Sequence, residues 1–228
     1  ELAHSAGARL AVDSTCATPV FTRPIALGAD IVMHAATKYL NGHSDVIAGA
    51  LVTARDDDFW QRIRTIRAQL GTVLGALESY LLLRGMRTLF PRVRTAASNA
   101  QWLAERLAEH PLVESVLYPG LSGFAGHPAA ARQMQGGFGA MMSIRVKAGT
   151  GLTGEQAAIA VAARTELWKR ATSLGGVESL VEHRASVEGT GTPAPPDLLR
   201  LSVGIEAKED LLADLDQALA AAHRRNEP

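Results

Sequence analysis

The sequence is poor in cysteine and aromatic residues and has no excess of either charge. Its 228 residues include a single cysteine, Cys16, which excludes an internal disulfide and predicts a protein of the reducing cytoplasm. Basic and acidic residues number 23 each, so the chain carries no electrostatic footprint for nucleic acid or an anionic membrane. No apolar run approaches the length of a membrane span. We therefore expect neither partner, and we expect Cys16 to be a small buried residue rather than a nucleophile.

Glycine and alanine, by contrast, are plentiful, as is typical of a close-packed α/β protein. Apolar runs and helical spacing of apolar residues predict most of the elements. The predicted strands are 8–12, 29–33, 46–52, 113–117, 138–146 and 198–203. The predicted helices are 72–84, 87–109, 154–164 and 206–223, with a loop at 189–197 and a frayed tail at 226–228. The helix at 72–84 is too apolar for a free surface, so a subunit or domain contact is expected there.

The long helix at 87–109 is a candidate link between two domains. We predict a first domain over residues 1–105, which includes the start of this helix, and a small α+β domain over residues 106–228. Residues 1–7 are typical of the end of a helix with Gly7 as its cap, and no initiator methionine precedes them. The sequence is therefore expected to be the C-terminal part of a longer protein.

Two residues at predicted strand ends are candidates for chemistry. Lys38 follows the strand 29–33 in a turn-rich segment, where small and apolar neighbours can desolvate its amine and leave it able to form a Schiff base. Asp13 ends the strand 8–12, and ligands of open α/β sheets gather outside the carboxyl ends of the strands. Each residue also has an ordinary explanation. A lysine at a strand end usually reaches into water, and an aspartate there often caps a helix or a turn.

Several further segments add a family resemblance that covers nearly the whole chain. They are 36–45 (ATKYLNGHSD), 83–89 (LRGMRTL), 118–121 (YPGL), 136–139 (GGFG), 173–176 (SLGG) and 200–204 (RLSVG). Together with Asp13 they resemble the Cys/Met-metabolism family of pyridoxal-phosphate enzymes. The resemblance implies an α/β protein of fold-type I, a PLP-dependent transferase fold with a mostly parallel sheet in a major domain, only part of which is present. It also implies a small α+β C-terminal domain and a homotetramer built as a dimer of dimers.

The resemblance also implies roles for individual residues. Lys38 would hold pyridoxal 5'-phosphate as a Schiff base and then move protons on the substrate, and Asp13 would pair with the pyridine nitrogen. Thr15 would lie beside the ring and Thr37 would reach the phosphate. Arg200 would clamp the substrate α-carboxylate with help from Ser173. No metal is implied, and His43 and Asp45 are expected to be structural. The simpler alternatives are a turn cap for Thr37, a local backbone bond for Ser173 and a surface ion pair for Arg200.

The reaction implied is γ- or β-elimination, or γ-replacement, on a small sulfur amino acid. Cystathionine, homocysteine or methionine, and an O-acyl-homoserine are the candidate substrates, and lyase and transferase are not separated. The sequence departs from the common family pattern at several positions. Ala35 stands where a serine often contacts the phosphate. Ser14 and Cys16, which follow Asp13, replace the more usual Asn and Phe. Thr172 replaces a glutamate that is common in cystathionine-handling members. Residues 182–186 lack the usual His-Pro.

Two other functions fit the sequence less well. The first is a catalytically incomplete fragment that serves only as a folding or oligomerisation module of such an enzyme, which the expected absence of the N-terminal half of the pocket favours. The second is a dinucleotide-binding oxidoreductase, which suits the α/β composition. No Gly-x-Gly-x-x-Gly follows a predicted strand, so the second function is disfavoured.

Overall fold

The computed structural model describes residues 1–224, and the predicted frayed tail at 226–228 lies outside this range. The chain divides into two compact units, Glu1–Pro91 and Arg92–Pro228. The division falls in the first turn of helix α5 (Leu89–Ala108), which is the long linking helix expected from the sequence. The structural units divide at residue 91, and the domain boundary expected at residue 105 stays a prediction.

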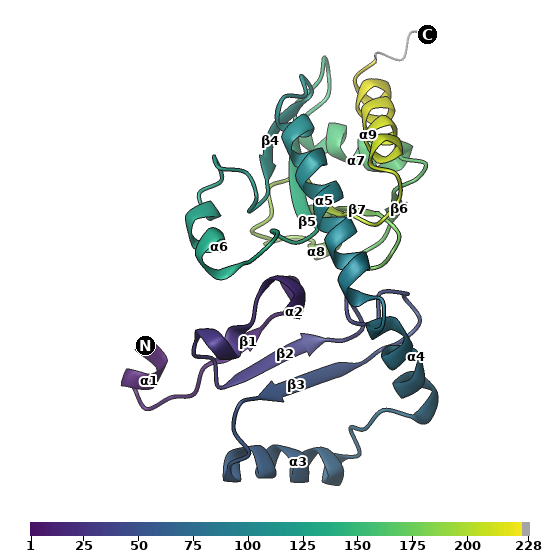
Figure 1. The fold of residues 1–228 in the computed structure, drawn as a ribbon. Helices are drawn as coiled ribbons and strands as arrows, with labels where there is room; N and C mark the ends of the chain where they lie inside the picture. The colour runs from purple at the N-terminus through teal and green to yellow at the C-terminus, as the bar shows by residue number, and fades with distance from the viewer. Residues whose placement is uncertain (225–228) are drawn as a thin grey trace. The chain divides into compact units, whose positions relative to one another are not determined.

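The first unit is built on a three-stranded sheet with the order β1-β2-β3 (Figure 1). Strand β1 (Ala11–Asp13) runs parallel to β2 (Ile31–Ala35), with Asp13 opposite Met33. Strand β3 (Gly49–Thr53) runs antiparallel to β2. The part of the sheet present here is therefore mixed. Because β1 and β2 are parallel, their carboxyl ends meet at one edge of the sheet.

The helices of the first unit are α1 (Leu2–Ser5), α2 (Thr18–Phe21), the 3-10 helix η1 (Pro24–Leu27), α3 (Asp58–Leu70) and α4 (Ala76–Met86). Helix α3 begins where Asp57 accepts a hydrogen bond from the Trp60 N–H at 3.0 Å. Helix α4 carries a row of exposed apolar side chains at a spacing of three residues, namely Leu77, Tyr80 and Leu83, each more than half exposed. This row agrees with the expectation that the helix is too apolar for a free surface.

The second unit is an α+β structure around a five-stranded sheet with the order β4-β5-β8-β7-β6. The strands are β4 (Val113–Leu117), β5 (Met141–Val146), β6 (Lys169–Arg170), β7 (Leu180–His183) and β8 (Leu198–Ser202). All neighbouring pairs are antiparallel except β6 and β7. The helices, besides α5, are α6 (His127–Gln133), α7 (Gly154–Arg164), α8 (Arg184–Glu188) and α9 (Lys208–His223).

The core of the second unit lies where helices α5, α7 and α9 bury their apolar faces. Leu103 of α5, Val161 of α7 and Leu215 of α9 are each 0% exposed, as the helical spacing of apolar residues predicts. Asp214 of α9 is also buried, because its carboxylate accepts hydrogen bonds from the backbone N–H groups of residues 166–168 at 2.8–3.1 Å. Burial without those partners would be costly for a carboxylate.

One expectation is wrong and several short elements were not predicted. Cys16 is exposed, because it lies in the turn after β1 and not inside a strand. Strand β7 and helix α8 were not predicted, and neither were the short elements α2, η1 and β6. Within residues 1–224, no helix has both the length and the apolar character to cross a membrane. The same residues hold no cluster of three or more His, Cys, Asp or Glu side chains suited to a metal ion.

Candidate active site

The structure brings Asp13 and Lys38 to the same edge of the sheet. Asp13 is the last residue of β1, and Lys38 follows the end of the parallel strand β2 by three residues. The Lys38 N–H donates to the carbonyl oxygen of Ala35 at 3.0 Å, which turns the chain immediately after the strand. Asp13 is exposed and Lys38 is half-buried. The two residues that the sequence paired therefore stand at adjoining strand ends.

Thr15 connects these two strand ends. Its hydroxyl oxygen accepts a hydrogen bond from the Ala35 N–H at 2.8 Å, while its own N–H donates to Oδ1 of Asp13 at 2.9 Å. The first bond holds the turn after β1 against the end of β2, and the second fixes the rotamer of the Asp13 carboxylate. Among the residues that the structure describes, Oδ2 of Asp13 has no hydrogen-bond partner. One carboxylate oxygen is thus oriented, and the other is open to a ligand.

Thr37 uses its hydroxyl to close the segment that carries Lys38. The Thr37 hydroxyl donates to the Ala48 carbonyl at 3.2 Å and accepts from the Ala48 N–H at 2.9 Å. Since a hydroxyl has a single proton to donate, contact with a phosphate oxygen would require exchange of the 3.2 Å bond. The structure places Thr37 next to Lys38, with its hydroxyl engaged in the local fold.

The rest of the lysine segment is held by Asn41, which is 1% exposed. Its side-chain nitrogen donates to Asp45 at 2.7 Å, and its carbonyl oxygen is bonded by Nδ1 of His43 at 2.7 Å. Gly42 has a φ of 75°, a left-handed conformation that suits glycine. His43 and Asp45 therefore have structural partners within the segment itself.

His34, on β2, is a buried polar residue that the sequence pattern did not single out. Its side chain is 6% exposed, and its Nδ1 has no hydrogen-bond partner among residues 1–224. Burial lowers the pKa of His34 and outweighs the opposing effect of the Asp13 charge. The imidazole is therefore neutral at pH 7.

In the second unit, Arg200 and Ser173 lie together. Arg200 is on β8, and its Nη2 donates to the carbonyl oxygens of Thr172 at 2.6 Å and Ser173 at 3.2 Å. Nη2 also forms an ion pair with Glu182, which lies on β7 directly opposite Arg200 in the antiparallel pairing of β7 with β8. The contact between Ser173 and Arg200 is thus made by the Ser173 backbone. The carboxylate paired with Arg200 is buried, since the Glu182 side chain is only 3% exposed.

Three residues that the sequence analysis did not assign fix the irregular segment around Ser173. The Ser202 hydroxyl accepts from the Gly175 N–H at 2.9 Å. Glu206 accepts from both the N–H and the hydroxyl of Ser179, at 2.7 and 2.9 Å. The signal available in the sequence was two polar residues at the end of a buried strand, because Ser202 is the last residue of β8 and Glu206 follows four residues later.

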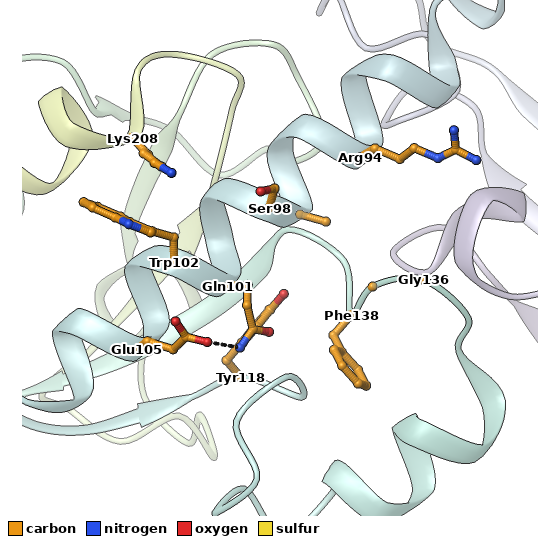
Figure 2. Close-up of a pocket in the computed structure, with 11 residues that line it drawn as sticks. Arg94, Ser98, Gln101, Trp102, Glu105, Tyr118, Gly136, Phe138 and Lys208 are labelled. Carbon is orange, nitrogen blue, oxygen red and sulfur yellow. Dashed lines mark hydrogen bonds between the residues drawn. The ribbon is translucent and has the colours of Figure 1, made fainter.

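A cavity of about 540 Å³ in the second unit contains none of the predicted site residues (Figure 2). Figure 2 shows Gln101, Trp102 and Glu105 on helix α5 and Phe138 on a separate segment that also lines the cavity. Gln101 donates to Glu105 at 2.8 Å, and the hydroxyl of Tyr118 donates to the Gly139 carbonyl at 2.8 Å. Local partners satisfy these groups, so the cavity adds no reactive group to the predicted site.

Comparison with known proteins decides the family. Residues 1–220 match the family described as Cys/Met metabolism PLP-dependent enzyme. The chain belongs to this family. It is 47% identical over 224 residues to a cystathionine gamma-synthase of Mycobacterium tuberculosis, covering 96% of this chain and 56% of the relative. It is 44% identical over 226 residues to a cystathionine beta-lyase of Lactococcus lactis subsp. cremoris, covering 96% of this chain and 57% of the relative.

A solved structure gives the same result. A cystathionine gamma synthase from Xanthomonas oryzae pv. oryzae, in complex with cystathionine, has a TM-score of 0.89 and 42% identity, covering 96% of this chain and 57% of that one. The predicted resemblance and the α/β fold of type I are therefore confirmed. The chain spans a little over half the length of the relatives it matches.

The family's cofactor is pyridoxal 5'-phosphate, and the residues of the first unit suit it. The cofactor needs an amine for its aldehyde, an anion for its pyridine nitrogen and hydroxyl groups near the ring and the phosphate. Lys38 offers the amine, and the open Oδ2 of Asp13 offers the anion on the adjoining strand. The hydroxyl of Thr15 lies between the two strand ends, and that of Thr37 is next to the lysine.

Proposed function

We propose that the protein is a pyridoxal-phosphate enzyme of sulfur amino-acid metabolism that catalyses elimination or replacement at Cγ or Cβ. The observation that supports this proposal best is the shared sheet edge of Asp13 and Lys38, which Thr15 ties together. When bound, the cofactor supplies an electron sink for the charge that develops at the substrate α-carbon. The chain must supply a positioned base, an anion opposite the ring nitrogen and a grip on the carboxylate.

Each residue has one task in this proposal. Lys38 holds the cofactor and, once the substrate amine has displaced it, moves the proton at Cα. The negative charge of Asp13 keeps the pyridine nitrogen protonated, and Thr15 fixes the orientation of that carboxylate. Arg200 binds the substrate α-carboxylate, a task for which its planar fork is better suited than an ammonium group. Ser173 presents its backbone beside Arg200.

The proposed substrates are cystathionine, homocysteine or methionine, and an O-acyl-homoserine. The relatives differ in reaction, since one is a gamma-synthase and another a beta-lyase, so the family alone does not choose among these substrates. The proposal therefore commits to an amino acid with a free α-carboxylate and a sulfur or ester leaving group. Purified protein should be incubated with each substrate. Release of a keto acid with ammonia identifies a lyase, and a new thioether identifies replacement chemistry.

Cofactor binding provides the first test. The protein loaded with pyridoxal phosphate should show the visible absorbance of a lysine Schiff base, and borohydride should abolish it. Lys38→Ala should lack the band, whereas Lys169→Ala, which removes an exposed lysine of the second unit, should keep it. A Lys38→Ala variant that retains a borohydride-sensitive band would disprove the assignment of Lys38.

The alternative role is an association module without catalysis. The presence of Asp13, Lys38 and Arg200, and the identity to enzymes over 96% of the chain, favour an enzyme. We further propose a cytoplasmic homotetramer formed from two dimers. The exposed apolar row of α4 supports association, because apolar patches of this kind are usually covered. Sedimentation analysis would measure the assembly, and an oligomer with no cofactor band would favour the association module.

A further inference from the structure

Arg200 shares its buried carboxylate with a second arginine. Glu182 lies on β7 with its side chain 3% exposed, and its Oε2 faces Arg200. Its other oxygen, Oε1, accepts a hydrogen bond from Nη1 of Arg184 at 2.9 Å. Arg184 is held from its far side by Glu188, one helical turn along α8, with 2.5 Å between Nη2 and Oε1. The order of charges is thus Arg200, Glu182, Arg184, Glu188.

The donors of Arg200 are unevenly used. Nη2 donates hydrogen bonds to the carbonyls of Thr172 and Ser173, and it also forms an ion pair with the carboxylate of Glu182. Nε and Nη1 have no hydrogen-bond partner in the described part of the chain. Either two-pronged face of a guanidinium uses one N–H of Nη2, together with Nε or Nη1. A carboxylate that binds Arg200 in this way must therefore displace one of the present partners of Nη2.

Glu182 is the partner best able to yield. The two carbonyl oxygens belong to the backbone of the segment that Ser202 holds in place, whereas Glu182 contributes a side chain. A buried carboxylate that loses its only cation is strongly destabilised. Glu182 does not lose its only cation, because Oε1 stays bonded to Arg184.

We propose that Arg184 is a positioning residue that keeps Glu182 neutralised while Arg200 transfers its two-pronged contact to the ligand carboxylate. The inference rests on the proposed function, since it assigns the substrate α-carboxylate to Arg200. Arg184 never touches the substrate. It lowers the cost of releasing Arg200 and so increases the affinity for amino acids.

The sequence adds one observation. Arg184 occupies the position at which the family pattern commonly has proline after histidine, and proline carries no charge. It is also the first residue of α8, where its backbone needs no helical partner and its side chain can reach back to β7.

The test measures binding of L-norleucine, which has no leaving group, to the cofactor-loaded protein by the change in cofactor absorbance. Pentylamine, the same molecule without its carboxylate, is the companion probe. Arg184→Gln should raise the Kd of norleucine about tenfold and leave that of pentylamine unchanged. Arg184→Lys should restore most of the affinity. Arg145→Gln, which breaks a 2.9 Å pair with Asp197 at another place on the sheet, should have no effect on either probe.

A double-mutant cycle separates the proposed role from a structural one. In a Glu182→Gln background there is no buried charge to neutralise, so Arg184→Gln should change the norleucine Kd less than about twofold. Persistence of the tenfold effect in that background, or an equal loss for pentylamine, would overturn the role of Arg184. If Arg200→Lys weakens norleucine binding and Arg184→Gln does not, the further inference fails alone. If Arg200→Lys leaves norleucine binding unchanged, the carboxylate assignment in the proposed function fails.

Discussion

The α-carbon of Gly85 packs against the backbone of Asn41, so closely that a β-carbon on Gly85 would lie 2.3 Å from the Asn41 carbonyl oxygen. Asn41 is the residue that holds the lysine segment together. Because both partners of this contact are backbone, neither can move aside as a side chain would. Helix α4 can therefore pack this closely against the segment that carries Lys38 only because Gly85 has no β-carbon.

Gly85→Ala should lower the free energy of unfolding by about 3 kcal/mol, the upper part of the usual range for an overpacked core. Urea denaturation followed by circular dichroism measures the change. Gly49→Ala is the matched control, because its β-carbon would meet no atom within 4 Å among the described residues. Equal stability of the two variants would show that the helix tolerates the extra carbon.

Thr15→Val should weaken both the fold and cofactor binding. The substitution keeps the shape of the side chain and removes the oxygen that accepts the Ala35 N–H, at an expected cost of about 1–3 kcal/mol in unfolding free energy. The dissociation constant of pyridoxal phosphate should rise as well, because the turn that orients Asp13 is loosened. Thr15→Ser keeps the acceptor and should behave like the parent in both measurements.

Ser202→Ala should reduce the affinity for norleucine without affecting cofactor binding. The Ser202 hydroxyl holds the Gly175 N–H at 2.9 Å in a buried position, and the same segment presents the Ser173 carbonyl to Arg200. Loss of the bond leaves a buried N–H unsatisfied and lets the segment move. Ser115→Ala, at an exposed position on β4, is the control. An unchanged norleucine Kd in Ser202→Ala would separate the segment from ligand binding.

Asp214 should contribute stability that depends on pH. Burial raises the pKa of Asp214, but hydrogen bonds from the backbone of Glu166 and Trp168 and from Gln217 outweigh it, so the pKa lies below its ordinary value. A carboxyl with a lowered pKa stabilises the fold above its unfolded pKa of about 3.9, and this stability is lost as the pH falls through the folded value.

The melting temperature should therefore fall below about pH 4 more steeply in the parent than in Asp214→Asn, which should also be less stable at pH 7. Asp210→Asn, in the exposed first turn of the same helix, should retain the parent's profile. Parallel profiles for the parent and Asp214→Asn would show that the carboxylate is not linked to folding.

The sequence predicted that Asp13 and Lys38 lie at one edge of the sheet because the pattern of each strand and its end is local. A buried strand that ends in an acid, and another that runs into a lysine-bearing turn, place both groups wherever the two strands are parallel neighbours. Helix α7 and strand β4 were predicted at their observed residues, since each has a clear periodic pattern between strong end signals.

The features that were missed depend on long-range pairing. Glu182 and Arg200 face each other through the register of β7 and β8, which no periodic pattern fixes in advance. The antiparallel course of β3, the short strand β7 and the exposure of Cys16 were also missed. For the strands, the neighbour that decides the conformation lies elsewhere in the sequence, whereas Cys16 is exposed because the strand ends before it.

Strands β1 and β2 are consecutive in the chain and are joined by residues 14–30, which contain α2 and η1. Asp13 and Lys38, the residues proposed to hold the cofactor, thus lie in one stretch of sequence that is translated long before Arg200. Translation therefore completes the proposed cofactor-binding residues before the residue proposed to bind the substrate carboxylate. A nascent chain arrested between them would hold the lysine and the aspartate but not the arginine.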